Sequence, residues 1–235
     1  MLPTLRPRTR HRLDRFWADL FGTVPADREA QIVEHGPRLA RYPGIYAIRR
    51  TGRSFVSVPP ALTEVVREWA PGQDAVVDPS LWAERLPGWR VLGPSEHSFL
   101  DQYSHLPEAA GARPASGEDV RAALAGRVDA ADWSESGFDS DIAHAWLLGD
   151  RNPRAVAAAN LTLFDDVPAD VGVLVARDAR GRHYGTAVAA TAARFAVETH
   201  GLARWRTRSS NTPSLEIAAR LGFETDCTQL AARPV

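Results

Sequence analysis

The stretch that most constrains this sequence is an apolar run that leads into an Arg/Gly-rich turn and then into an alanine-rich segment. The apolar run spans 171–175 (VGVLV), the turn spans 180–185 (RGRHYG) and the helix-forming segment spans 188–195 (VAATAARF). A short β-rich run, a glycine turn and a helical pattern in this order predict a strand–turn–helix unit. The free N–H groups of such a turn point in one direction, and the helix dipole adds partial positive charge. The stretch therefore predicts a turn that holds a phosphate.

Composition narrows the partners that such a turn serves. The chain has 235 residues and a net charge of −1, so no global field favours nucleic acid. The basic stretch between Arg6 and Arg12 is interpreted as a solvated tail leading into a helix, and nucleic-acid binding through it is the minor alternative. No apolar run approaches the ~20 residues of a membrane span. We therefore expect neither nucleic acid nor membrane among the partners.

The basic and sulfur-containing side chains limit the chemistry. Every basic side chain of the Lys/Arg class is Arg, which excludes a catalytic Lys. Cys227 is the single cysteine, so no intramolecular disulfide can form, and this fits a reducing, cytoplasmic location. Cys227 has no adjacent base in sequence, which argues against a nucleophilic role.

The pattern of apolar and turn residues predicts a mixed α/β protein with two parts. We expect an N-terminal α/β accessory domain over 1–105, a Pro/Ala/Gly-rich link over 106–116 and a second domain over 117–235. Three expected helices cover 13–21, 62–69 and 117–124, and two more begin at 184 and 213. The expected strands cover 44–48, 54–58, 142–148, 155–163, 171–175 and 204–208. A last expected hairpin covers 223–232.

A second signature follows the phosphate turn. It reads Asn211-Thr-Pro-Ser214 and then Leu221-Gly222-Phe223-Glu224, with Ala218 between the two parts. The two signatures in this order resemble the GCN5-related N-acetyltransferase (GNAT) superfamily. The resemblance implies a central, mostly antiparallel twisted sheet flanked by helices, with an acyl-coenzyme A as ligand. The N-terminal half is interpreted, by analogy alone, as a degenerate remnant of the same fold.

The resemblance also implies which residues hold the coenzyme. The strand would pair its backbone with the pantetheine arm, the turn would hold the pyrophosphate, and the second signature would line the far side. The implied coenzyme-binding residues are Val173, Leu174, Val175, Arg180, Gly181, Arg182, His183, Tyr184, Gly185, Thr186, Asn211 and Ser214. An ordinary strand–turn–helix connection without a ligand is the alternative for the turn taken alone.

The turn fits the family pattern in two registers. One runs over 180–185 and puts His183 where the family usually has Gly; the other runs over 182–187 and is complete. The distance from the strand favours the first. His183 then either clashes mildly with the pyrophosphate or adds a hydrogen bond to it, and both interpretations stay open.

The implied reaction is the attack of an amine on the acyl thioester, which needs a base, an oxyanion donor and a proton for the thiolate. A backbone N–H within 173–175, splayed from the neighbouring strand, would be the donor. Asp170 and Glu135 are the candidate bases, and His144 is a weaker candidate. The alternative for Asp170 is a residue of a strand edge or turn without a catalytic role, and the alternative for Glu135 is a solvated residue at a helix end. Ala218 stands where many family members place a Tyr acid, so water, Tyr184 or another group would protonate the thiolate.

We therefore expect an N-acyltransferase that uses acetyl-CoA or another acyl-CoA as co-substrate, without a metal. The expected partner is a small amine or amino-acid-like acceptor; a homodimer is left open. The alternatives are a non-catalytic acyl-CoA sensor and, less favoured, a peptide N-terminal acetyltransferase. Three tryptophans are interpreted mainly as core residues and otherwise as walls of the acceptor pocket: Trp133, Trp146 and Trp205.

Overall fold

The structure is a computed structural model that describes residues 4–22, 30–50, 52–107, 111–149 and 154–235. Its contacts divide the chain into two compact units. The first consists of Met1–Arg6, Ser98–Thr207 and Thr212–Glu224; the second consists of Pro7–His97, Arg208–Asn211 and Thr225–Val235. The domain ranges expected from the sequence stay a prediction, although the contacts group Thr225–Val235 with the second unit.

The first unit is built on a mixed sheet. Its strands lie in the order β9-β8-β7-β6-β5, and the pairs from β8 to β5 are antiparallel, whereas β8 and β9 are parallel. The bounds are β5 (Ala112–Ala115), β6 (His144–Gly149), β7 (Ala155–Phe164), β8 (Val167–Val175) and β9 (Ala203–Arg208).

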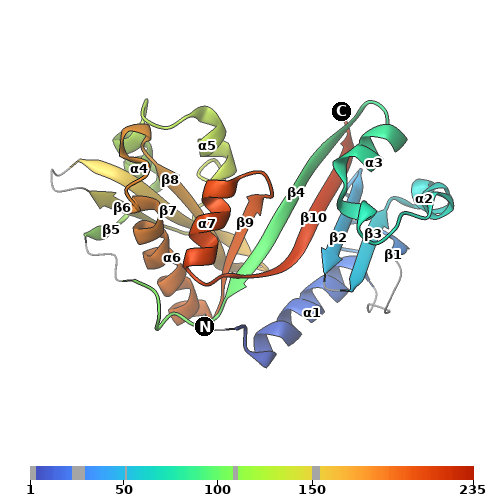
Figure 1. Cartoon of the computed structure of the whole chain (residues 1–235), viewed down its shortest axis with the longest axis horizontal. Coiled ribbons are helices and arrows are strands. Elements are labelled where there is room, and N and C mark those ends of the chain that lie inside the picture. The colour runs from blue at the N-terminus through green and yellow to red at the C-terminus, as the bar shows by residue number, and fades with distance from the viewer. Residues whose placement is uncertain (1–3, 23–29, 51, 108–110, 150–153) are drawn as a thin grey trace. The chain divides into compact units, whose positions relative to one another are not determined.

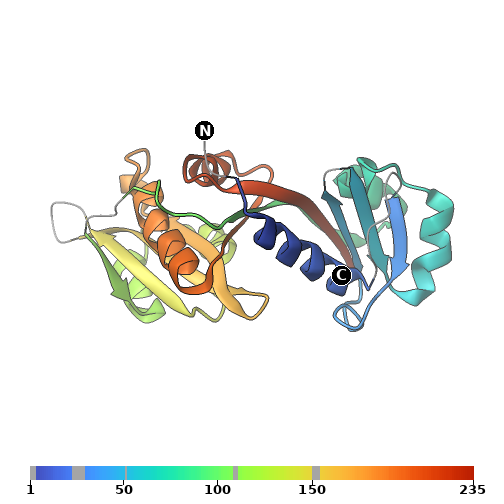
Figure 2. The same cartoon turned by 90° about the horizontal axis from the view of Figure 1, so that it is seen from below.

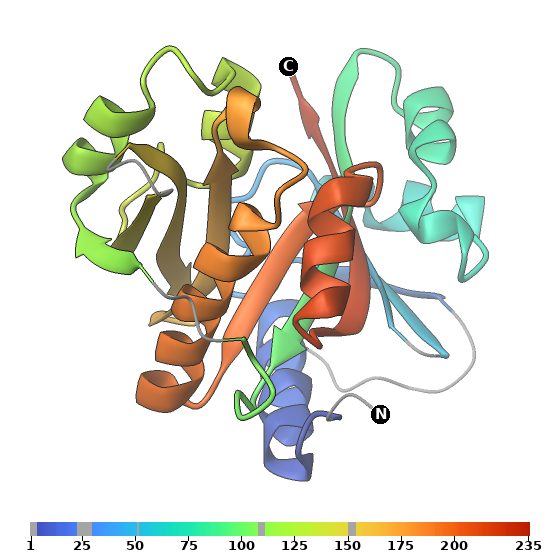
Figure 3. The same ribbon diagram turned by 60° about the vertical axis from the view of Figure 1, so that its left-hand side comes forward.

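Helices cover both faces of this sheet (Figures 1 and 3). On one face, α6 (Tyr184–His200) and α7 (Thr212–Arg220) pack in one apolar cluster with Val171 of β8. On the other face, α4 (Gly117–Leu124) packs in a second cluster with Leu174 and Ala176, next to α5 (Ala130–Glu135). This division follows the two-residue period of a strand. The alanines of α6 that face the sheet are fully buried and allow the helix to approach it closely.

The strands of the second unit lie in the order β1-β3-β2-β10-β4. Its elements are α1 (Pro7–Phe21), β1 (Ala30–Glu34), β2 (Ile45–Arg50), β3 (Arg53–Val58), α2 (Thr63–Trp69), α3 (Pro79–Arg85), β4 (Trp89–Leu100) and β10 (Glu224–Pro234), with 3-10 turns over Pro60–Leu62 and Ala75–Val77. Strand residues Ala47 and Val56 pack with α2 and α3, whereas Phe55 contacts Phe21 of α1. Helix α1 thus lies on the face of these strands opposite α2 and α3 (Figure 2).

The mixed α/β class expected from the sequence is confirmed, as are most of the expected elements. One detail is wrong. The segment 223–232 was expected as a hairpin but forms the single long strand β10, which pairs antiparallel with β2. The link over 106–116 stays a prediction. Within it Ala112–Ala115 form β5, where Pro114 is tolerated because the strand lies at the sheet edge; residues 108–110 lie outside the described residues. Among the described helices, none is both long and apolar enough to cross a bilayer.

Candidate functional site

Strands β8 and β9 run parallel, and among the described residues their pairing is limited to one position. The register between them consists of the pair Asp170↔Arg204 within the described residues. On its other side, β8 pairs with β7 along its length, from Phe164↔Val167 to Ala157↔Val175. The later part of β8 therefore has a partner on one side and an unpaired backbone on the side toward β9.

The direction of each backbone group follows from the antiparallel register between β7 and β8. Ala157 lies opposite Val175, and the next N–H, that of Ala176, donates to the carbonyl oxygen of Val156 at 2.9 Å. Because these bonds alternate along an antiparallel pair, the N–H and C=O of Leu174 also face β7. The N–H and C=O groups of Val173 and Val175 point to the other side. Of the three residues predicted to meet the pantetheine arm, these two present the unpaired backbone.

The turn after β8 leads into α6 without a capping side chain. A 3-10 turn over Arg177–Ala179 is followed by Gly181 at φ 75° and by His183 at the N-cap, with φ 62° and ψ 11°. The first helical bond runs from the N–H of Ala187 to the carbonyl oxygen of His183 at 3.0 Å. The N–H groups of the first helical turn therefore have no intrahelical acceptor. This geometry fits the register over 180–185, in which a left-handed residue precedes the helix.

The glycines of the turn differ in what surrounds them. A Cβ on Gly185 would lie 3.1 Å from side-chain atoms of both Ile217 and Val175, so Gly185 serves the packing of α6 on β8 and α7. A Cβ on Gly181 would meet nothing within 4 Å, so this residue faces open space. Tyr184 and Thr186 are half-buried, and Tyr184 contacts the apolar clusters of both sheet faces. The exposed part of the predicted phosphate turn is thus 180–183.

The arginines near the turn are paired with carboxylates to different degrees. A guanidinium nitrogen of Arg180 lies 2.6 Å from a carboxylate oxygen of Asp132 and 3.8 Å from one of Asp129, both at the start of α5. Arg182 is exposed and has no hydrogen bond or ion pair with any residue that the structure describes. Arg182 is therefore the cation of the turn whose charge is not already neutralised by a carboxylate.

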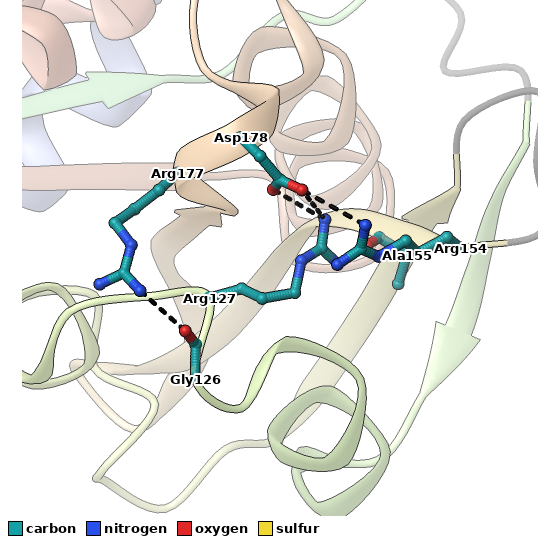
Figure 4. Close-up of polar contacts among 6 residues, drawn as sticks. All are labelled: Gly126, Arg127, Arg154, Ala155, Arg177 and Asp178. Carbon is teal, nitrogen blue, oxygen red and sulfur yellow. Dashed lines mark hydrogen bonds and ion pairs between the residues drawn. The ribbon is translucent and has the colours of Figure 1, made fainter.

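A second set of arginines fixes the segment between β8 and the turn (Figure 4). Arg127 donates to both carboxylate oxygens of Asp178, at 2.9 and 3.2 Å, and to the carbonyl oxygen of Ala155 at 2.6 Å. Arg177 donates to the carbonyl oxygen of Gly126 at 2.8 Å. The hydrogen bond from Arg127 holds the pKa of the Asp178 carboxyl below its ordinary value. These contacts hold the loop that precedes α5 against the segment that follows β8.

The two candidate bases have different surroundings. Asp170 lies 3.4 Å from a guanidinium nitrogen of Arg204, and both side chains are largely buried, with 12% and 9% exposed. The guanidinium of Arg204 also stacks over Phe164 at 4.5 Å from the ring centroid. Glu135 is the last residue of α5 and is exposed. Asp170 is thus held in an internal ion pair, while the side chain of Glu135 lies at the surface.

The remaining predicted residues are distributed as follows. Ser214 accepts a hydrogen bond at 3.0 Å from the indole N–H of Trp205, which is buried, so Trp205 is a core residue that ties β9 to α7. Asn211 directly precedes α7 in the chain and belongs to the second unit. The other side chains lie in packed surroundings: Trp146 and Ala218 are buried in the cluster under α6, His144 packs against Phe195, Trp133 packs against Phe138, and Cys227 is buried in β10.

One residue at the turn was missed by the sequence analysis. Arg220, the last residue of α7, places a guanidinium nitrogen 3.1 Å from the Nδ1 of His183. A basic residue in the last turn of a helix is ordinary, because it complements the helix dipole. Only the packing of α7 beside the start of α6 brings this arginine to the turn, and no local sequence signal indicates that contact.

Comparisons with known proteins agree on the type of domain. A family model described as "Acetyltransferase (GNAT) domain" matches residues 97–224. Among solved structures, an acetyltransferase of the GNAT family from Colwellia psychrerythraea is 15% identical with a TM-score of 0.50, over 77% of this chain and 76% of that one. GCN5-related N-acetyltransferases from Kribbella flavida (21% identity, TM-score 0.45, 76% and 67% covered) and Sphaerobacter thermophilus (15%, 0.47, 89% and 74%) are also similar. A search of curated proteins finds no match.

Proposed function

We propose, from the premise that this chain belongs to the GNAT acetyltransferase family, that it transfers an acyl group from acyl-CoA to the amine of a small or amino-acid-like acceptor. Acetyl-CoA is the proposed co-substrate. The observation that carries the proposal is the unpaired edge of β8 at Val173 and Val175, which leads directly into the uncapped start of α6. The first feature suits the amide-rich pantetheine arm and the second suits a phosphate.

The exposed part of the turn fits an anionic ligand. The N–H groups at the start of α6 and the guanidinium of Arg182 supply donors and positive charge, and Gly181 leaves space for a close approach of phosphate. Arg180 is already held by Asp129 and Asp132, so we assign it to fixing the turn rather than to neutralising the coenzyme.

The proposed reaction is direct attack on the thioester. The amine nitrogen bonds to the acyl carbon, and the N–H of Val173 donates to the carbonyl oxygen as it gains negative charge. When the tetrahedral intermediate collapses, the C–S bond breaks, the amide forms and the thiolate takes a proton from Tyr184 or water. The attacking amine loses its proton to a base.

We assign the base to Glu135 rather than to Asp170. A carboxylate that is ion-paired and largely buried has to separate from its cation before it can take a proton from a ligand. Asp170 is in that position because of Arg204, whereas Glu135 is exposed at the end of α5.

The other parts of the proposal are a cytoplasmic location, supported by the single buried cysteine, and the small amine as partner.

A second candidate function is a non-catalytic acyl-CoA sensor. Two observations favour it: the buried Ala218 stands in place of an acid, and Asp170 is engaged by Arg204. The sensor and the enzyme share the coenzyme site and differ only in turnover. A peptide acceptor is a further outcome of the same test.

The test measures the release of the CoA thiol from acetyl-CoA with a panel of small amines, amino acids and short peptides. We expect release with at least one small amine, and loss of most of that rate in Glu135→Gln with unchanged acetyl-CoA affinity. Glu118→Gln, on α4, is the matched control for removing an exposed carboxylate and should keep the rate. Binding without release for every acceptor would favour the sensor, and equal effects of Glu135→Gln on rate and affinity would remove Glu135 as the base.

A further inference from the structure

A fully buried asparagine joins the candidate base segment to the strand that carries the proposed oxyanion donor. Asn160, in β7, has 0% of its surface exposed. Its side-chain nitrogen donates to the backbone carbonyl oxygen of Ser136 at 3.1 Å, and its side-chain oxygen accepts from the N–H of Gly172 at 3.0 Å. One side chain thus links three segments of the first unit: the residue that directly follows α5, the middle of β7 and the middle of β8.

The contact is so close that β8 requires a glycine at this point. A Cβ on Gly172 would lie 1.8 Å from the carbonyl oxygen of Ser136 and 2.4 Å from the side-chain oxygen of Asn160. Real Cβ atoms do not approach heavy atoms this closely, so the carbonyl of Ser136 and the side chain of Asn160 occupy the space of the missing side chain. The carbonyl oxygen of Ser136 is also a hydrogen-bond acceptor, and a buried acceptor needs a donor. Asn160 supplies it.

The two hydrogen bonds of Asn160, called the Asn160 clip below, lie next to residues that the proposed reaction uses. Gly172 precedes Val173, whose N–H is on the unpaired side of β8, and Ser136 follows Glu135. The hydrogen bond to the N–H of Gly172 fixes the peptide plane between Val171 and Gly172, which directly precedes the plane that carries the N–H of Val173. Holding Ser136 fixes the end of α5. A core position whose only task is packing is usually apolar, because a buried amide stabilises little unless all its polar atoms are paired.

We propose that Asn160 is a positioning residue, which aligns the N–H of Val173 with the acyl carbonyl of the bound thioester and fixes the end of α5 beside it. This inference rests on the proposed function, because it needs acyl-CoA at the β8 edge. It adds Asn160 to the residues of the proposed site. Asn160 does not touch the ligand and acts through the backbone of Gly172 and Ser136. Misalignment by about 1 Å lowers turnover by about 10²-fold in well-oriented sites.

The test uses the carbonyl stretching band of acetyl-CoA labelled with ¹³C at the acetyl carbonyl, recorded by difference infrared spectroscopy on the full chain without an acceptor. A hydrogen bond to this oxygen weakens the C=O bond and lowers the band relative to free acetyl-CoA. We expect the lowered band in the unmodified protein and its return toward the free position in Asn160→Leu, which removes both side-chain hydrogen bonds. Gly172→Ala, which pushes Ser136 away from β8, should give the same shift if Asn160→Leu does not fold.

Val120→Ala is the matched control, because Val120 is a fully buried core residue of α4. Its truncation lowers stability and leaves both hydrogen bonds of the Asn160 clip in place. It should keep the lowered band. A band in Asn160→Leu or Gly172→Ala that matches that of Val120→Ala would overturn the positioning role while leaving the proposed function standing. An unmodified protein that does not bind acetyl-CoA would instead overturn the proposed function and this inference with it.

Discussion

The Nδ1 of His183 lies 3.1 Å from a guanidinium nitrogen of Arg220, so a residue at the N-cap of α6 meets the last residue of α7. Because arginine only donates, the histidine nitrogen is the acceptor in this contact. His183 makes it from a left-handed backbone conformation with φ 62°. Histidine is more tolerant of this conformation than most residues, but only glycine adopts it without strain. His183 therefore stands at a position where the backbone conformation favours glycine.

The first prediction concerns that backbone strain. His183→Gly and His183→Ala both remove the imidazole and its contact with Arg220, and they differ in whether a Cβ stays in the left-handed conformation. We expect His183→Gly to be more stable than His183→Ala by about 1 kcal/mol, because the left-handed conformation costs a residue with a Cβ about that much. Urea unfolding of the two variants measures the difference. Equal midpoints would contradict the N-cap geometry.

The second prediction separates the two arginines of the turn. Arg182→Gln should weaken acetyl-CoA binding about tenfold, since a charge-assisted hydrogen bond contributes about 1.5–3 kcal/mol and each 1.4 kcal/mol is tenfold. Arg180→Gln should weaken it less, because Asp132 and Asp129 already neutralise Arg180. Calorimetric titration of both variants at low ionic strength makes the comparison. A larger loss in Arg180→Gln would reverse our assignment of the phosphate-binding cation.

The local signals in the sequence predict the strand–turn–helix unit on which the candidate site lies. The glycine turn and the alanines of α6 follow from residue type and spacing, and the structure places them in one strand–turn–helix unit. The left-handed backbone at His183 is a finding of the structure, at a position where the family resemblance implies a glycine. What depends on packing between distant segments was not predictable. Arg220 reaches the turn across the interface of α6 and α7, and Asn160 meets Ser136 from 24 residues away. The closing hairpin was wrong for the same reason: pairing with β2, distant in sequence, keeps β10 extended.

A third prediction addresses Asp170 and its partner. Asp170→Asn should lower the free energy of unfolding by about 3 kcal/mol, because it leaves the largely buried Arg204 without its carboxylate. The control is Asp74→Asn, which breaks the ion pair of Asp74 with Arg49; the Asp74 side chain is 90% exposed, so its loss should cost less than about 1 kcal/mol. Chemical denaturation gives both values. If the two substitutions have the same small effect, Asp170 is not held by Arg204 and returns as a candidate base.

A fourth prediction concerns His35 in the second unit. Its Nδ1 lies 2.7 Å from the hydroxyl of Ser57 and its Nε2 lies 2.8 Å from the carbonyl oxygen of Gly44. Burial lowers the pKa of His35 below 6.5 and outweighs the opposite effect of the hydrogen bond to Gly44. The unfolded chain then binds a proton more readily than the folded one, so stability is full above about pH 6.5 and falls as the pH drops toward the folded pKa.

The measurement compares thermal or urea unfolding of the unmodified protein and His35→Gln between pH 7.5 and 5.5. The unmodified protein should lose more stability over this range than the variant, because only the variant lacks the titrating group. His11→Gln, an exposed histidine of α1, is the control and should follow the unmodified protein. Parallel curves for the unmodified protein and His35→Gln would show that His35 does not link folding to pH.

The central claim is that the edge of β8 and the start of α6 together bind an acyl-CoA. Calorimetric titration of acetyl-CoA into the full chain tests it most directly, with coenzyme A and free acetate as reference titrants. We expect saturable binding of one acetyl-CoA per chain, retained in part by coenzyme A and absent for acetate, since the turn recognises phosphate and the strand recognises the pantetheine arm. No saturable heat, together with an unchanged unfolding temperature at the highest acetyl-CoA concentration, would contradict the account.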